Sequence, residues 1–131
     1  MYFQYGTAFE HAYEMNPGQE LDRLVAERVM GWKLHSRNMV HYMRATDDEM
    51  RSRPVVDVRE WNPSEDIADA WLVVEKLARR RYEVGVQTSD GRYTVLIARN
   101  GQASAVASAE TAPHAICLAA IQAYGQKVEI G

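Results

Sequence analysis

The chain is poor in several residue types and patterns on which common functions depend. Its 131 residues include a single cysteine, Cys117, which excludes an intrachain disulfide and a cysteine-based zinc site. Acidic residues outnumber basic ones, 18 Asp and Glu against 15 Lys and Arg, and this argues against a general nucleic-acid binder. No apolar run approaches the roughly 18 residues of a membrane span, and the N-terminus does not resemble a signal peptide. We therefore expect a cytoplasmic protein with no membrane association.

Catalytic and metal-binding motifs are also missing. The sequence has no P-loop, GxSxG, HExxH or GxGxxG motif. Its four histidines are not spaced as metal ligands. Cys117 falls on the apolar stripe of an expected helix, where a thiol packs inertly. These features predict a protein that is not an enzyme and carries no cofactor or metal.

The clearest pattern present is a three-stranded antiparallel meander over residues 82–109. Apolar and polar residues alternate with period two in the first two runs, as in half-buried strands. Asp90-Gly91 and Asn100-Gly101 separate the runs, and these residue types tolerate the positive φ of tight hairpins. The third run, 103–109, is small on both faces, so a helix can approach it closely.

Apolar spacings of three and four residues predict three helices around this meander. The first begins at Asn16, which Pro17 follows. The second begins at Asn62, which Pro63 follows, or at Ser64. The third follows Thr111 and ends near Gly125. The face of the second helix that we expect to lie on the sheet consists of Ile67, Ala70, Trp71, Val74 and Leu77.

These elements predict an α+β fold of the order α-α-β-β-β-α in a single domain over residues 16–125. Residues 1–15 form an aromatic N-terminal extension, and 126–131 form a tail. Residues 33–61 are expected to be a long loop or insertion, with a short helix near 38–44 and an extended piece near 54–58.

Three stretches carry a resemblance to a known family. They are LDRLVAERVMGW (21–32), PSEDIADAW (63–71) and TAPHAICLAA (111–120). The chain resembles the small phage-encoded α/β "ABA sandwich" family over roughly residues 15–125. Where that family usually carries Ser-Thr-Asp, this chain has Ser64-Glu65-Asp66, so any role of the Thr hydroxyl is lost here. The resemblance implies a phage protein with a host-takeover, anti-defence or replication-related role.

Seven residues are candidates for contacting a ligand. Trp32 and Trp61 flank helix ends, where they either pack in the core or form a stacking wall for a planar ring. Ser64, Thr111 and His114 lie at helix N-termini, which bind phosphate through free backbone N–H groups. His35 and Arg37 belong to the long loop, which either is a solvated insertion or contacts an anionic ligand.

The sequence leaves two main hypotheses about function. One is a binder that sequesters a small nucleotide-derived signalling molecule in the host cell and so counters a bacterial defence. Homo-oligomerisation would help such a small domain to build a pocket. The alternative is an adaptor or inhibitor that docks on a host protein through aromatic residues 1–14. A nucleic-acid-binding accessory role is less well supported.

Overall fold

The computed structural model describes residues 15–37, 40–44 and 55–130, with side chains described for 15–33, 57 and 59–124. The expected aromatic extension and its proposed docking role therefore lie outside the described residues. Within the described ranges, none of the helices combines the length and apolarity needed to cross a membrane.

A three-stranded antiparallel sheet confirms the predicted meander. Its strand order is β4-β5-β6, with Val86 opposite Val95 and Leu96 opposite Val106. Both connections are two-residue turns with positive φ at each position, 53° and 76° at Asp90-Gly91 and 54° and 78° at Asn100-Gly101. This is the turn type whose twist matches paired strands. The strands are β4 (Glu83–Ser89), β5 (Arg92–Arg99) and β6 (Gln102–Ala109).

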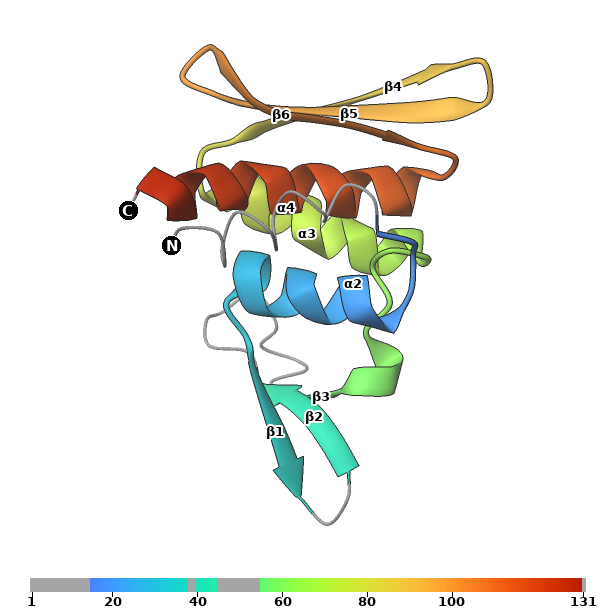
Figure 1. Cartoon of the computed structure of the whole chain (residues 1–131), viewed down its shortest axis with the longest axis vertical. Coiled ribbons are helices and arrows are strands. Elements are labelled where there is room, and N and C mark those ends of the chain that lie inside the picture. The colour runs from blue at the N-terminus through green and yellow to red at the C-terminus, as the bar shows by residue number, and fades with distance from the viewer. Residues whose placement is uncertain (1–14, 38–39, 45–54, 131) are drawn as a thin grey trace.

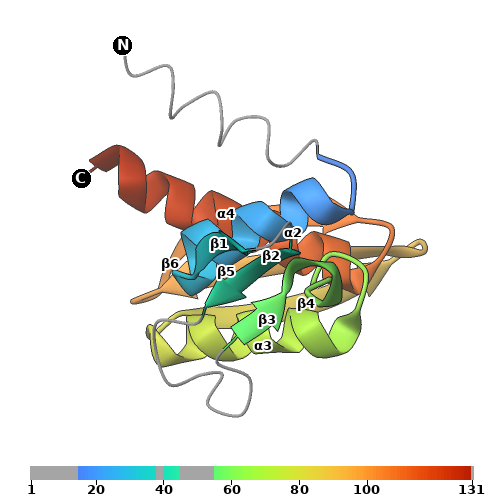
Figure 2. The ribbon, with the colours of Figure 1, turned by 90° about the horizontal axis from the view of Figure 1, so that it is seen from below.

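The helices form a layer beneath this sheet. Helix α4 (Ala112–Ile130) lies directly under the sheet, with α3 (Ile67–Arg79) beside it and α2 (Gln19–Val25) further from the sheet (Figures 1 and 2). A π-helical turn, η1 (Ala26–Met30), continues α2. The element order confirms the predicted α+β fold.

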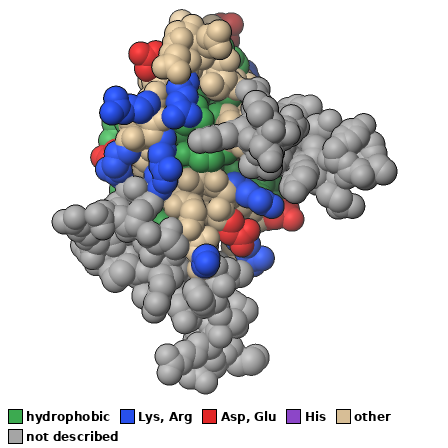
Figure 3. Space-filling model, turned by 90° about the vertical axis from the view of Figure 1, so that its left-hand side faces the viewer, with side chains coloured by type: hydrophobic (Ala, Val, Ile, Leu, Met, Phe, Trp, Pro, Cys, Tyr) green, Lys and Arg blue, Asp and Glu red, His purple; other side chains and the backbone are tan. Residues whose placement is uncertain are grey.

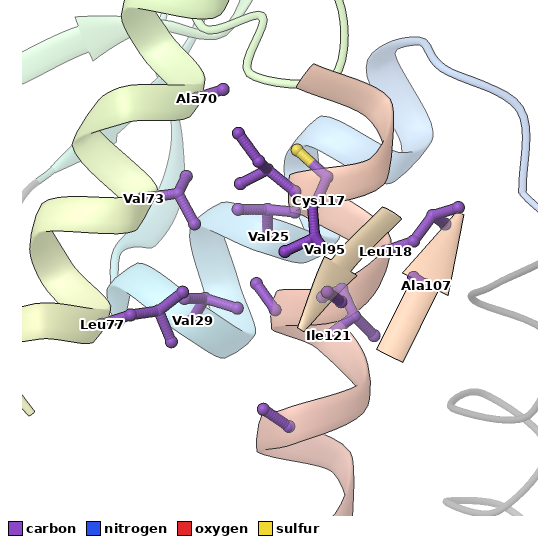
Figure 4. Packing of buried hydrophobic residues seen from close by; sticks show 14 of the residues in the cluster. Val25, Val29, Ala70, Val73, Leu77, Val95, Ala107, Cys117, Leu118 and Ile121 are labelled. Carbon is purple, nitrogen blue, oxygen red and sulfur yellow. The ribbon is translucent and has the colours of Figure 1, made fainter. Parts of the chain in front are cut away.

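The core lies where α4 meets all of its neighbours. Residues 115–121 of α4 are all buried, so this helix is enclosed on every side. Figure 4 shows side chains from α2, η1, α3, α4 and the sheet converging there: Val25, Val29, Ala70, Val73, Leu77, Val95, Ala107, Cys117, Leu118 and Ile121. The small residues of β6 and α4 allow this close contact, as the sequence predicted.

Two of the predicted helix starts are wrong. Helix α2 begins at Gln19 rather than near Asn16, because Gly18 has a non-helical φ of 149° and its carbonyl accepts the first helical hydrogen bond, from the Asp22 N–H at 3.0 Å. The Gly18 N–H donates to Ser64 Oγ at 2.9 Å. Helix α3 begins at Ile67, where the Asp66 carboxylate accepts from the Ala68 N–H at 2.8 Å. The Asn62 side chain is not the cap.

The third helix start is confirmed and its end is not. The His114 N–H donates to Thr111 Oγ1 at 3.4 Å, so Thr111 caps α4. The helix then continues through Gly125 to Ile130, five residues beyond the predicted end.

Trp71 corrects the predicted orientation of α3. Its side chain and that of Ile67 are each 53% exposed, so the face that carries them does not lie on the sheet. Helix α3 instead buries Ala70, Val73 and Leu77 beside α4. It has two adjacent apolar faces, and periodicity alone did not distinguish the inner face from the outer one.

Residues 33–61 contain a second antiparallel sheet rather than a long loop. Its order is β1-β2-β3, and it projects from the helical layer on the side opposite the large sheet (Figure 1). The predicted helix near 38–44 is wrong, because residues 40–44 form β2, which pairs antiparallel with both β1 and β3. The extended piece near 54–58 is confirmed. The elements are β1 (Lys33–Arg37), β2 (Val40–Arg44), β3 (Val55–Asp57) and the 3-10 turn η3 (Val58–Glu60).

Candidate functional site

A pocket of about 350 Å³ opens at the start of α4. Three chain segments form it: the approach to α2, the first residue of β5, and the link from β6 into α4. Its volume is at the lower end of the range for small-molecule sites. The pocket is lined by Asn16, Pro17, Arg92, Glu110, Thr111 and His114.

Local hydrogen bonds fix the shape of this pocket. Thr111 caps the first turn of α4 through the His114 N–H. The His114 ring then reaches Met15, its Nε2 lying 2.8 Å from the carbonyl oxygen. Because a carbonyl oxygen only accepts, Nε2 carries the proton and donates. This contact holds the chain before α2 across the start of α4.

The pocket combines groups of opposite charge. The Arg92 guanidinium and the positive end of the α4 dipole favour an anionic ligand group. The Glu110 carboxylate repels an anion but accepts hydrogen bonds from hydroxyl groups. This arrangement suits a small ligand that bears both an anionic group and hydroxyls.

The two tryptophans pack against each other in the interior. Trp32 and Trp61 have ring centroids 4.5 Å apart with planes tilted by 54°, and both side chains are buried. Trp61 Nε1 donates to the Asp22 carbonyl oxygen at 3.0 Å. Of the two interpretations from the sequence, this geometry is that of core packing.

Ser64 joins the same interior cluster. Its Oγ accepts from the Gly18 N–H at 2.9 Å, and its N–H donates to Asp22 Oδ1 at 2.7 Å. Asp22 is 1% exposed, and burial raises the pKa of its carboxyl group above the ordinary 3.8. Within the described part of the chain, Asp22 Oδ2 and Trp32 Nε1 have no hydrogen-bond partner.

The predicted site residues therefore fall into separate groups. Thr111 and His114 line the pocket, whereas the Trp32, Trp61 and Ser64 side chains lie together in the interior. His35 and Arg37 belong to β1 in the second sheet, opposite Tyr42 and Val40 respectively. The side chains of those two residues are outside the described set.

Sequence reasoning missed four of the pocket residues: Asn16 and Pro17, which it used as a helix start, and Arg92 and Glu110. Arg92 follows the Asp90-Gly91 turn, and the meander brings its end of β5 beside the end of β6. The pairing of these two strands was therefore the sequence signal that could have placed Arg92 beside Glu110 and Thr111. Among the described residues, no group of three His, Cys, Asp or Glu side chains is placed to hold a metal ion.

Arginines also gather at the opposite end of the helical layer. Figure 3 shows Lys and Arg side chains grouped on the face where α3 ends and β4 begins. The Arg99 guanidinium lies 4.8 Å from the centre of the Tyr82 ring. Arg80 is the C-terminal cap residue of α3, where positive charge complements the helix dipole. The arginines of this region are Arg79, Arg80, Arg81 and Arg99.

Comparisons with known proteins agree with this architecture. The family model described as the phage ABA sandwich domain matches residues 23–121. The chain is also similar to the crystal structure of a phage protein from Bacillus cereus, with 28% identity and a TM-score of 0.56. That match covers 83% of this chain and 92% of the other. None of the curated proteins matches this chain.

Proposed function

We propose that this chain, which belongs to the phage ABA sandwich domain family, binds a small nucleotide-derived signalling molecule without transforming it. Held in the cytoplasm of the host cell, such a molecule is withheld from a bacterial defence that depends on it. Sequestration requires affinity alone, so the protein needs no catalytic groups for this role.

The pocket at the start of α4 is the observation that carries the proposal. A nucleotide offers phosphate to the Arg92 guanidinium and to the α4 N-terminus. Its ribose hydroxyls can donate to the Glu110 carboxylate, a pairing that nucleotide sites use widely. A volume of about 350 Å³ accommodates part or all of a mononucleotide unit.

The test is calorimetric titration with a panel of cyclic nucleotides and cyclic ADP-ribose-type molecules. We expect Arg92→Ala to weaken binding by roughly tenfold or more, because a charge-assisted hydrogen bond to phosphate contributes about 1.5–3 kcal/mol. Arg80→Ala is the matched control, since it removes an exposed arginine at the far end of α3. Glu110→Gln should weaken binding of ribose-containing ligands more than that of inorganic phosphate.

The bound molecule should also be recovered unchanged. After heating the complex, mass spectrometry should return the ligand with its original mass. Conversion to a product would contradict the non-enzymatic role. Binding to no member of the panel, or equal losses in the Arg92 and Arg80 variants, would contradict the assignment of the pocket.

A further inference from the structure

The outer face of α3 is apolar in the middle and charged at both ends. Ile67, Trp71, Val74 and Ala78 recur at spacings of four, three and four residues, which places them on one side of the helix. Ile67 and Trp71 are each 53% exposed, Ala78 is exposed and Val74 is half-buried. Exposed tryptophan flanked by aliphatic residues is typical of protein–protein contact surfaces.

The charges at the two ends of this stripe have opposite signs. Glu65 and Asp66 are exposed just before the first turn, and Arg79 and Arg80 are exposed at the last. The midpoint of the stripe falls between Trp71 and Val74. The acidic and basic ends lie at nearly equal distances from that midpoint along the sequence.

We propose that α3 pairs with α3 of a second copy of this chain in an antiparallel, twofold-symmetric contact. This arrangement sets Trp71 against Val74 of the second copy and Ile67 against Ala78. It also brings Glu65 towards the second copy's Arg80, so each acidic end meets a basic end. A parallel pairing would instead bring like charges together. The proposal is independent of ligand binding at the pocket.

A partner of this kind fits the surface because the stripe is complementary to itself. Twofold dimers use the same patch on both subunits, and this requires opposite charges to be related by the axis. The antiparallel alignment of the two helix dipoles also favours this pairing, as the opposite charges at the helix ends do. The 13 residues of α3 span about 20 Å, so the contact is small and the dimer should dissociate on dilution.

The first test measures mass against protein concentration by analytical ultracentrifugation. Trp71→Glu should raise the dimer dissociation constant by roughly tenfold or more, because a central tryptophan is the residue type on which such contacts most depend. Leu96→Glu is the matched control: Leu96 is a 44% exposed apolar residue on the outer face of the large sheet. It should leave the dimer unchanged. Circular dichroism should show that both variants are folded.

The second test checks the antiparallel register. We would mix Ile67→Cys chains with Ala78→Cys chains and add a short bismaleimide cross-linker. The mixture should form covalent dimers in higher yield than either variant alone, because residue 67 lies opposite residue 78 of the other copy. The native Cys117 is fully buried and should not react.

Three outcomes would overturn the proposal. One is a wild-type chain that stays monomeric up to roughly 1 mM. Another is a dimer that Trp71→Glu and Leu96→Glu weaken equally. The third is cross-linking of each cysteine variant alone as efficiently as the mixture, which would indicate a parallel pairing.

Discussion

The Asp22 carboxylate connects two segments that are distant in sequence. It accepts from the Ser64 N–H, while Ser64 Oγ accepts from the Gly18 N–H. The start of α2 and the turn before α3 are thereby joined by two hydrogen bonds. Ser64, first considered as a ligand group, acts in this structure as part of that connection.

We predict that Asp22→Ala lowers the free energy of unfolding by about 1–3 kcal/mol, because the buried Ser64 N–H loses its acceptor. Asp22→Asn keeps an acceptor oxygen and should be better tolerated. Urea denaturation of the three proteins at neutral pH measures the difference. An equal decrease in the free energy of unfolding for both variants would contradict the view that an acceptor oxygen at position 22 stabilises the Ser64 N–H.

The charge of Asp22 predicts a pH dependence. Burial raises the pKa of Asp22 above 3.8, so the native state holds this proton more tightly than the unfolded state. Its stabilising contribution is therefore complete below pH 3.8 and falls as the pH rises through the interval up to the raised pKa. Across that interval, Asp22→Asn should gain stability relative to the wild type.

Asp57 supplies a control of opposite sign. Hydrogen bonds from Arg59 lower the pKa of Asp57 to about 2, so its contribution is present above pH 3.8 and is lost as the pH falls towards 2. Asp57→Asn should therefore lose stability relative to the wild type as the pH rises from 2 to 4. The effect should be small, because this ion pair is exposed at Arg59.

The residues of the candidate site differ in how well the sequence predicts their roles. Thr111 and His114 were predictable, because a cap and a first-turn residue are defined by local sequence. Arg92 has no such local signal, because only the pairing of the predicted meander strands, which sets the start of β5 beside the end of β6, places it at the pocket. Trp32 and Trp61 were assigned two roles, and their burial together with a ring-centroid separation of 4.5 Å distinguishes core packing from ligand stacking.

At the scale of elements, the residue that follows the C-terminal cap of α3, Arg81, has a backbone conformation that arginine does not favour. The Arg81 N–H donates to the Ala78 carbonyl and the Tyr82 N–H to the Leu77 carbonyl, each at 3.0 Å. This pattern is a Schellman motif, which requires a left-handed residue. Arg81 occupies that position with φ at 70°, where glycine is normally preferred.

We predict that Arg81→Gly raises the free energy of unfolding by about 1 kcal/mol, because it relieves the left-handed strain at the end of α3. Arg80→Gly is the control: φ at Arg80 is −92°, so glycine there only adds backbone entropy to the unfolded state and should destabilise. Thermal and urea unfolding of both variants measure the contrast. Destabilisation by Arg81→Gly equal to that by Arg80→Gly would contradict it.

Elements with strong local signals were predicted and those without were not. The meander was recoverable because period-two alternation and two Gly-containing turns agree with each other. The second sheet was missed because its strands are only three to five residues long and the polar residues among them suggested a loop. The face of α3 was misassigned because both of its adjacent faces are apolar.

At the scale of the whole molecule, α4 is the element on which every other layer of the main body rests. Residues 115–121 are buried between the large sheet on one side and α2 and α3 on the other. The second sheet projects away from this body, and its strand β1 contacts the body at η1, the turn that continues α2 (Figure 1). We therefore expect the sheet β4–β6 and the three helices to unfold as one cooperative unit.

Ile121→Ala tests this unit. Ile121 is fully buried between α4 and its neighbours, so its truncation should lower the free energy of unfolding by about 2–5 kcal/mol. Val106→Ala, at a 52% exposed position, should change it by no more than about 0.5 kcal/mol. Hydrogen exchange should show protection falling by the same factor in α3, α4 and β5 of the Ile121 variant, because their slowest amides exchange through the same global opening. If β5 lost protection while α3 kept it, the sheet and helices would be separate cooperative units.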